Sequence, residues 1–261
     1  MYSRVDTRRG GVILAAATLL LIQGIVVTAV RVPAYLGGDD VSHHHHHHHH
    51  EMVKVKVFYY EETLCPDCAK FGAGSMNEAV ENLSDYMDLY VVAYGNERYN
   101  ESTGTYTCQH GEEECYMNLI EACLDLYAGD DYRRYYPFFK CADDIVANVY
   151  PHIKGISAYI MKKCASTLPS DITPEILDSC ATGNLGQELI AISRHNTESL
   201  NPPHTYVPWV VVDKKPVFQN YDNISAIVCE EWARLNDANP PPECSKLAST
   251  PRQRVSGVCT L

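Results

Sequence analysis

Residues 53–68 read VKVKVFYYEETLCPDC, and this stretch decides the fold. Valine alternates with lysine before three aromatic residues, which is the period-two pattern of a half-buried β-strand. A C-x-x-C motif follows, and residues 69–87 then carry apolar side chains at helical spacing. Such a motif between a strand and a helix indicates thiol redox chemistry. The alternative, a zinc site, usually needs a second close pair of ligands, and the sequence has no other C-x-x-C.

The position of the motif predicts different roles for its two cysteines. If Cys65 caps the helix, Pro66 falls at the first helical position, where its missing N–H costs nothing. Unpaired backbone N–H groups and the positive helix end then stabilise a thiolate on Cys65, which Asp67 opposes slightly. Cys68 lies one helical turn further on. We therefore expect Cys65 to attack a substrate disulfide and Cys68 to resolve the mixed disulfide that forms.

The order of the remaining elements indicates an α/β, thioredoxin-like fold. We expect a strand at 89–94, a polar loop at 95–107, a helical insertion at about 108–183, a helix at 184–195, strands at 206–212 and 216–218, and a helix at 224–235. This order resembles a thioredoxin fold with an inserted helical, disulfide-stapled subdomain, as in DsbA-like proteins. Residues 53–239 would form this thiol reductase domain, and 240–261 would form a loosely ordered tail.

A valine–proline pair in the predicted strand 206–212 marks the expected substrate groove. In thioredoxin-like folds the residue before a cis-proline faces the C-x-x-C motif and helps to align the substrate strand. The resemblance therefore assigns this place to Val207 and Pro208. An ordinary trans proline at the start of a strand is the alternative.

A longer motif in the insertion, C-Q-H-G-x2-E-C-x2-N-x4-C, is the most specific pattern in the chain. Its fixed residues are Cys108, Gln109, His110, Gly111, Glu114, Cys115, Asn118 and Cys123. With it, residues 53 to about 244 resemble the gamma-interferon-inducible lysosomal thiol reductase (GILT) family. The resemblance implies a soluble glycoprotein that reduces disulfides of partner proteins in acidic endocytic compartments. It implies no cofactor beyond an external thiol that regenerates the dithiol.

We interpret this motif as mainly structural. Cys115 and Cys123 stand eight residues apart on a predicted helix, about 12 Å along its axis, which is too far for a disulfide between them. Each is expected to pair elsewhere, with the preceding loop or with the other cysteines of the insertion. Gly111 supplies the permissive backbone of a tight turn. His110 could instead tune Cys65 in space, and the sequence leaves both roles open.

The cysteine count predicts a thiol without an internal partner. Setting Cys65 and Cys68 aside leaves nine of the eleven cysteines, an odd number. Cys259, close to the chain end, is the leading candidate for a free or intermolecular thiol, which would permit a disulfide-linked dimer. Three N-x-S sequons make Asn82, Asn100 and Asn223 glycosylation candidates.

The N-terminus indicates the cellular compartment. Residues 1–30 place arginines before an apolar stretch, as in a secretory signal peptide, with an uncleaved signal anchor as the alternative. We interpret residues 31–52 as a linker whose run His43–His50 is a purification tag, and we assign no metal site to it. Translocation predicts a secreted or endosomal–lysosomal protein, with no stable membrane partner if the signal is cleaved.

The net charge of −12, from 21 Lys plus Arg against 33 Asp plus Glu, argues against nucleic-acid binding.

The predicted function is reduction of protein disulfides through the C-x-x-C dithiol. Two alternatives stay open. One is an oxidase or isomerase on the same fold, which a reduction potential would separate. The other is a non-catalytic secreted glycoprotein in which Cys65 and Cys68 form a structural disulfide that resists glutathione.

Overall fold

A computed structural model describes residues 52–129, 131–247 and 258–260. The predicted signal segment 1–30 and the histidine run of the predicted linker 31–52 lie outside the described residues. All eleven cysteines lie inside these ranges. Within the same ranges no helix has both the length and the apolar character that crossing a lipid bilayer requires.

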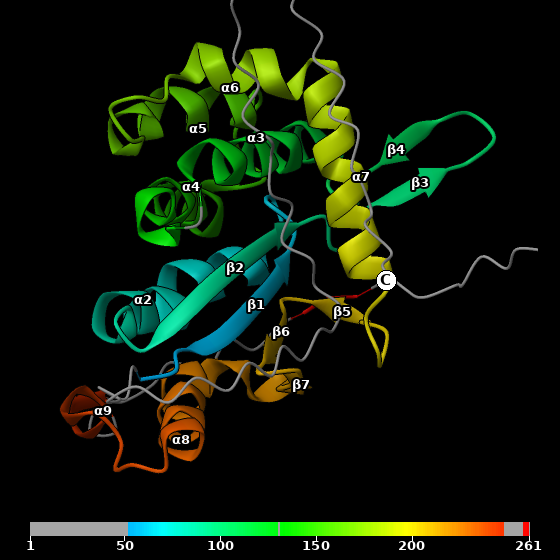
Figure 1. The fold of residues 1–261 in the computed structure, drawn as a ribbon. Coiled ribbons are helices and arrows are strands. Elements are labelled where there is room, and N and C mark those ends of the chain that lie inside the picture. The colour runs from blue at the N-terminus through cyan, green and yellow to red at the C-terminus, as the bar shows by residue number, and fades with distance from the viewer. Residues whose placement is uncertain (1–51, 130, 248–257, 261) are drawn as a thin grey trace, which may run out of the picture. The chain divides into compact units, whose positions relative to one another are not determined.

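A four-stranded mixed sheet forms the centre of the fold, with the strand order β2-β1-β6-β7 (Figure 1). Its strands are β1 (Val55–Glu61), β2 (Met87–Ala93), β6 (Trp209–Val212) and β7 (Lys215–Pro216). β1 runs parallel to β2 and antiparallel to β6, so Val57 pairs with both Leu89 and Val212. Val55, Val57 and Tyr59 are buried, as the alternation in the sequence predicts. A parallel β1–β2 unit joined to an antiparallel β6–β7 pair is the predicted thioredoxin-like arrangement.

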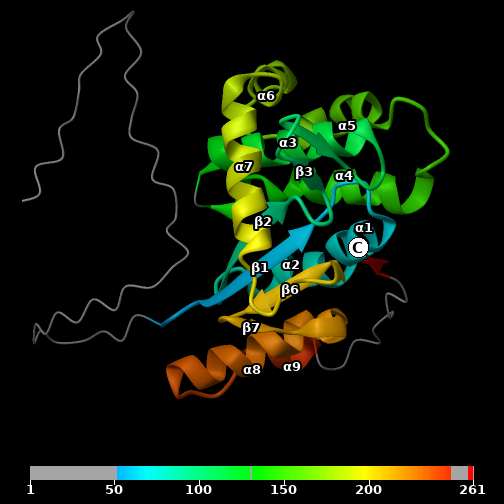
Figure 2. The ribbon, with the colours of Figure 1, turned by 90° about the vertical axis from the view of Figure 1, so that its right-hand side faces the viewer.

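The helix after β1 begins directly after Cys65 and has three segments. They are α1 (Pro66–Phe71), the π-helical turn η1 (Gly72–Met76) and α2 (Asn77–Leu83) (Figure 2). The helix predicted over 69–87 is right in kind but ends earlier, because Met87 already pairs with Val55 in the sheet. At Gly72 this helix closely approaches α4 (Tyr136–Val149), where an added Cβ would overlap the carboxylate of Asp143.

The helical insertion packs against the β2 side of the sheet (Figure 1). Besides α4 it contains α3 (Glu112–Ala128), η2 (Tyr132–Arg134), α5 (Ile156–Cys164), η3 (Ala165–Thr167) and α6 (Pro174–Ala181). The helix predicted at 184–195 follows the insertion as α7 (Asn184–Glu198). The disulfide Cys123–Cys180 ties α3 to α6, and Cys141–Cys164 ties α4 to α5. Cys115 pairs with Cys108 in the preceding loop, so the prediction that Cys115 and Cys123 bond elsewhere is confirmed.

The polar loop predicted at 95–107 contains a hairpin, which corrects that prediction. Its strands are β3 (Arg98–Asn100) and β4 (Thr105–Thr107), joined through a turn with Gly104 at a φ of 69°. Each strand has only three residues, and the outer two of each are exposed. Strands this short and polar carry too little hydrophobic periodicity to be recognised from sequence.

The C-terminal part closes the fold and also corrects one prediction. Its elements are β5 (Tyr206–Val207), the 3₁₀ turn η4 (Phe218–Asn223), α8 (Ile224–Asn236), α9 (Pro242–Leu247) and β8 (Cys259–Thr260). The tail predicted to be loosely ordered from 240 onward is ordered at α9 and β8. Cys229–Cys244 ties α9 to α8, and β8 pairs antiparallel with β5.

Candidate active site

Cys65 and Cys68 lie where the sequence predicts, at the N-terminus of α1. Cys65 is the N-cap residue, Pro66 opens the helix, and the backbone N–H of Cys68 donates to Cys65 Sγ at 3.4 Å. Both cysteines are fully buried. The hydroxyl of Tyr59 donates to the carbonyl oxygen of Cys68 at 3.0 Å and so ties the first turn to β1. A thiolate on Cys65 would therefore meet an N–H donor and the positive end of a helix.

The disulfide at this site joins Cys65 to Cys259, and Cys68 is the free cysteine. This pairing corrects the prediction that Cys259 is the unpartnered thiol available for a disulfide-linked dimer. It also differs from the alternative of a structural Cys65–Cys68 disulfide. The physical reason is β8, which carries Cys259 across the N-terminus of α1 and leaves Cys68 enclosed behind Cys65.

The Val207–Pro208 bond is cis, as predicted, and Val207 packs directly against both cysteines of the motif. In the β5–β8 ladder Val207 pairs with Cys259, and Tyr206 pairs with Thr260 (Figure 1). The position predicted for an extended substrate strand is thus filled by the chain's own C-terminal strand. Cys259 Sγ is bonded to Cys65 at the position that the sequence prediction assigns to a substrate sulfur.

Two side chains outside this ladder hold the backbone of β8. Asn96 donates through Nδ2 to the carbonyl oxygen of Cys259 at 3.1 Å, and Gln109 donates through Nε2 to that of Thr260 at 2.7 Å. Asn96 also donates to the Gln109 side-chain oxygen at 3.0 Å, which joins the two. Sequence analysis missed Asn96, since an isolated asparagine after a strand carries no recognisable signal.

The other signature residues connect α3 to the loop that carries Cys65. Asn118 accepts hydrogen bonds from the Thr63 N–H at 3.2 Å and the Thr63 hydroxyl at 3.0 Å, and it donates to Glu97 at 2.9 Å. Gly111, with a φ of 92°, is the N-cap residue of α3. Its left-handed backbone lets the chain turn from Cys108 into the helix, which supports the structural interpretation of this part of the motif.

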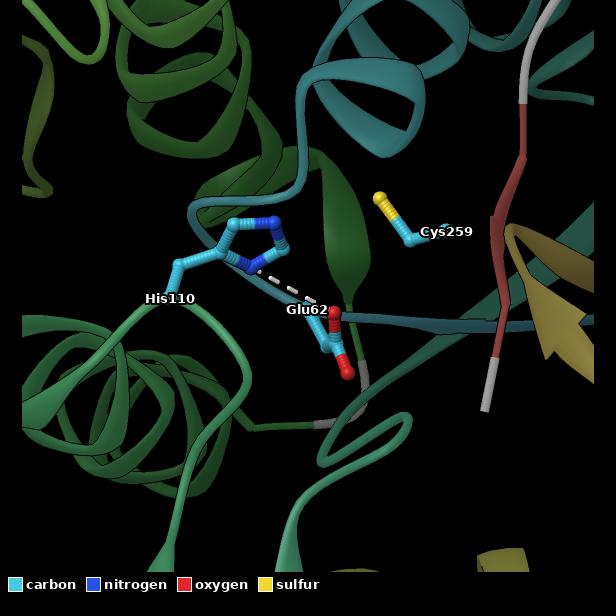
Figure 3. A group of neighbouring side chains, drawn as sticks. All are labelled: Glu62, His110 and Cys259. Carbon is cyan, nitrogen blue, oxygen red and sulfur yellow. Dashed lines mark ion pairs between the residues drawn. The ribbon is translucent and has the colours of Figure 1, made fainter.

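His110 lies beside Glu62 and Cys259 (Figure 3). Its Nδ1 lies 2.5 Å from Glu114 Oε2 and 3.6 Å from Glu62 Oε2, and its backbone N–H donates to Glu114 Oε1 at 3.0 Å. A ring nitrogen of His110, a carboxylate oxygen of Glu62 and the sulfur of Cys259 all lie within 4.8 Å of one another. The structure thus brings His110 to the sulfur bonded to Cys65.

Buried carboxyl groups surround the motif, and sequence analysis did not anticipate them. They are Glu61, Glu62, Glu97, Glu114, Glu121 and Asp143. Burial raises the pKa of Glu61 and of Glu97 to about 7, and burial together with Glu114 raises the pKa of Glu62 to about 9. Burial, followed by the nearby Glu61, also raises the pKa of the Cys68 thiol above its usual value. The one available signal was the pair Glu61–Glu62 placed at the end of a buried strand.

Three groups of side chains in the described ranges have the spacing of metal ligands. They are Glu62, His110 and Cys259; Cys65, Asp67 and Cys259; and Glu97, Cys108 and Cys115. Every cysteine in these groups belongs to a disulfide. A disulfide sulfur is not the thiolate that binds a metal, so these groups do not fit a metal site in this redox state.

The three sequon asparagines are exposed. Asn82 lies on α2, Asn100 ends β3, and Asn223 ends η4. Their accessibility is what modification requires, and glycosylation at these positions stays a prediction.

The chain is similar in sequence to known thiol reductases. Residues 54–168 match the family model described as gamma interferon inducible lysosomal thiol reductase (GILT). The chain is 31% identical over 206 residues to the gamma-interferon-inducible lysosomal thiol reductase of Mus musculus, covering 76% of this chain and 75% of that protein. It is 33% identical to the Carassius auratus protein of that name, covering 74% and 72%. Among solved structures, DsbA of Chlamydia trachomatis aligns at 13% identity with a TM-score of 0.49, over 74% of this chain and 98% of that one. The identity to the murine protein, over three quarters of both chains, shows that this chain belongs to the gamma-interferon-inducible lysosomal thiol reductase family.

Proposed function

We propose that this protein reduces disulfide bonds of other proteins, with Cys65 as the attacking and Cys68 as the resolving cysteine. The observation that carries the proposal is the Cys65–Cys259 disulfide. It joins the N-cap cysteine of α1 to a cysteine in an extended strand that pairs with Val207, beside the cis-proline. This is the arrangement that a mixed disulfide with a substrate strand would require.

The chemistry follows from the positions of the two sulfurs. A thiolate on Cys65 bonds to one substrate sulfur, and the second substrate sulfur leaves with the electron pair of the broken bond. Cys68 then loses its proton and bonds to Cys65 Sγ, which releases the first substrate sulfur. The substrate is reduced by two electrons and the Cys65–Cys68 pair is oxidised. An external thiol restores the dithiol by the same exchange.

Substrate recognition in this proposal relies on backbone groups. The β5–β8 ladder and the side chains of Asn96 and Gln109 all hold the backbone of β8. Backbone hydrogen bonds read an extended conformation and no particular sequence. The preferred partners would therefore be extended segments of partly unfolded, disulfide-containing proteins.

We place the activity in an acidic endosomal or lysosomal compartment reached through the secretory pathway. Relatives from Mus musculus and Arabidopsis thaliana carry the word lysosomal in their names. The raised pKa values of Glu61 and Glu97 also suit such a compartment, because at acidic pH these buried groups are neutral and need no charged partner.

A reduction assay with insulin at pH 5 and pH 7 tests the proposal. Cys259→Ser is used as the background so that Cys65 is open from the start. In that background Cys65→Ser should abolish reduction, whereas Cys68→Ser should accumulate mixed disulfides with the substrate. Trapping by the Cys65 variant and not by the Cys68 variant would reverse the roles, and no insulin reduction by the background protein would remove the function. Equilibration with glutathione separates a reductase from an oxidase, since an oxidase has the higher reduction potential.

A further inference from the structure

The Cys65–Cys259 disulfide shows what surrounds a substrate sulfur at the moment of release. In the resolving step the sulfur bonded to Cys65 is the leaving group, and Cys259 Sγ occupies its place. A ring nitrogen of His110 and a carboxylate oxygen of Glu62 lie within 4.8 Å of that sulfur and of each other. In Figure 3 the ring nitrogen that is not paired with Glu62 lies on the side of the Cys259 sulfur.

His110 is fixed in this orientation by three elements. Glu114 on α3 holds both its Nδ1, at 2.5 Å, and its backbone N–H, at 3.0 Å. Tyr150, after α4, meets the imidazole edge to face at a centroid distance of 6.0 Å. Glu62, after β1, faces Nδ1 at 3.6 Å through an oxygen that has no hydrogen-bond partner among the described residues. The remaining ring nitrogen is left for the sulfur.

We propose that His110 is the general acid that protonates the substrate thiolate released when Cys68 attacks the mixed disulfide. This inference rests on the proposed reductase function. The imidazolium gives one proton to the departing sulfur, which leaves with the electron pair of its bond to Cys65. Cys68 releases its own proton, which passes to solvent, before it attacks, and His110 regains one proton from solvent through its partly exposed ring. The step thus consumes no net proton.

The need for an acid follows from the surroundings of the leaving sulfur. A cysteine thiol has a pKa of about 8.5, so its thiolate is a poor leaving group. The groups that face His110 from the adjoining elements are Glu62, Glu114 and Tyr150, and Glu97 lies close to both carboxyl groups. None of these side chains is a cation, so among the side chains that face His110 only its own imidazolium would add positive charge to that of the α1 N-terminus. A ring nitrogen of His110 lies within 4.8 Å of the sulfur, a gap that one bridging water or a small rotation of the side chain would close.

The test compares two leaving groups in the Cys259→Ser background. Dithionitrobenzoate is an aromatic disulfide whose thiol is much more acidic than an alkyl thiol, so its thiolate leaves without a proton, whereas a cystine peptide releases an alkyl thiolate that needs one. We expect His110→Gln to slow turnover of the cystine peptide roughly 10- to 100-fold at pH 5 and to change that of dithionitrobenzoate less than about threefold. The matched control is His152→Gln, an exposed histidine, which should change neither rate.

Two further measurements keep the result interpretable. Circular dichroism and the thermal midpoint show whether His110→Gln folds, and Glu62→Gln, which keeps the side-chain shape, should give a weaker loss of the same selectivity. An equal slowing on both disulfides would mean that His110 only supports the fold, and unchanged rates on both would mean that it has no role. Either result overturns the inference while the reductase function stands. If the background protein reduces neither disulfide, the proposed function itself fails.

Discussion

Replacing Asn118 by alanine tests whether the longest motif in the chain is structural. The Asn118 amide makes three hydrogen bonds, two to Thr63 and one to Glu97. Asn118 is fully buried, and Thr63 and Glu97 are 3% and 5% exposed, so water cannot replace the lost partners. An unpaired buried group costs about 1–3 kcal/mol, and relaxation recovers part of that for three neighbouring groups. We therefore expect Asn118→Ala to lower the free energy of unfolding by about 3–5 kcal/mol.

The assay is thermal unfolding with all disulfides intact. For a domain of this size about 3–5 kcal/mol corresponds to a fall in the midpoint of roughly 6–20 °C. Asn148→Ala is the matched control, because Asn148 is exposed and its amide donates only to the backbone of Asp144, one turn earlier in α4. The control should lie within about 0.5 kcal/mol of the parent protein. An unchanged midpoint for Asn118→Ala together with a large loss of turnover at 25 °C would refute the structural reasoning and point to a catalytic role.

Three other outcomes are expected. Cys259→Ser should raise the number of titratable thiols from one to two under anaerobic conditions, because it frees Cys65. This variant should reduce substrate disulfides without prior activation. Cys244→Ser also frees one thiol but should leave Cys65 blocked by Cys259. The thermal midpoint should rise as the pH falls from 8 to 5. The native chain holds Glu61 and Glu97 with pKa values of about 7 against 4.5 when unfolded, so between these values it binds more protons than the unfolded chain. The lowered pKa of the half-buried His204 offsets only part of this difference. A thermal midpoint that falls steadily from pH 8 to pH 5 would contradict the sign. Gly72→Ala should destabilise the protein by about 1–3 kcal/mol because its Cβ meets Asp143, whereas Gly74→Ala, which has open space, should not. Equal midpoints for the two variants would refute the close packing of η1 on α4.

The parts of the fold that sequence could predict are those set by local chemistry. Alternating valines and lysines predict β1, and Pro66 predicts where the helix begins, since both effects act within a few residues. The bonds of Cys115 and Cys123 were also open to prediction in part, because helix geometry forbids a bond between them.

The partner of Cys259 could not be predicted because the contact is not local. Its bond to Cys65 joins residues 194 apart, and β8 is only two residues long, too short for a recognisable pattern. Counting cysteines assumed that Cys65 and Cys68 pair with each other. An odd number of cysteines does leave one thiol without a disulfide partner, but in the structure that thiol is Cys68, the resolving cysteine of the proposed mechanism.

The buried carboxyl groups escaped prediction for a different reason. Glutamates at the start of a predicted helix normally face water and favour the helix dipole, and Glu112 and Glu113 do remain outside the core. Glu114 turns inward because its carboxylate holds both the backbone and the ring of His110. Composition alone cannot distinguish Glu114 from Glu112 and Glu113, because the three differ only in which side of the first turn of α3 they occupy.

The placement of the signature residues explains why a reductase of this kind would need its insertion. The Cys108–Cys115 disulfide and Asn118 fix the loop before α3 against the loop that carries Cys65. Gln109 and His110, between those anchors, are then held toward β8, one at its backbone and the other at the sulfur of Cys259. A four-stranded sheet with a C-x-x-C motif supplies a nucleophile and a resolving thiol, but it places no proton donor beside the departing sulfur. In the proposed mechanism the insertion adds that donor, so the same short motif would combine structural anchors with two side chains that face the substrate.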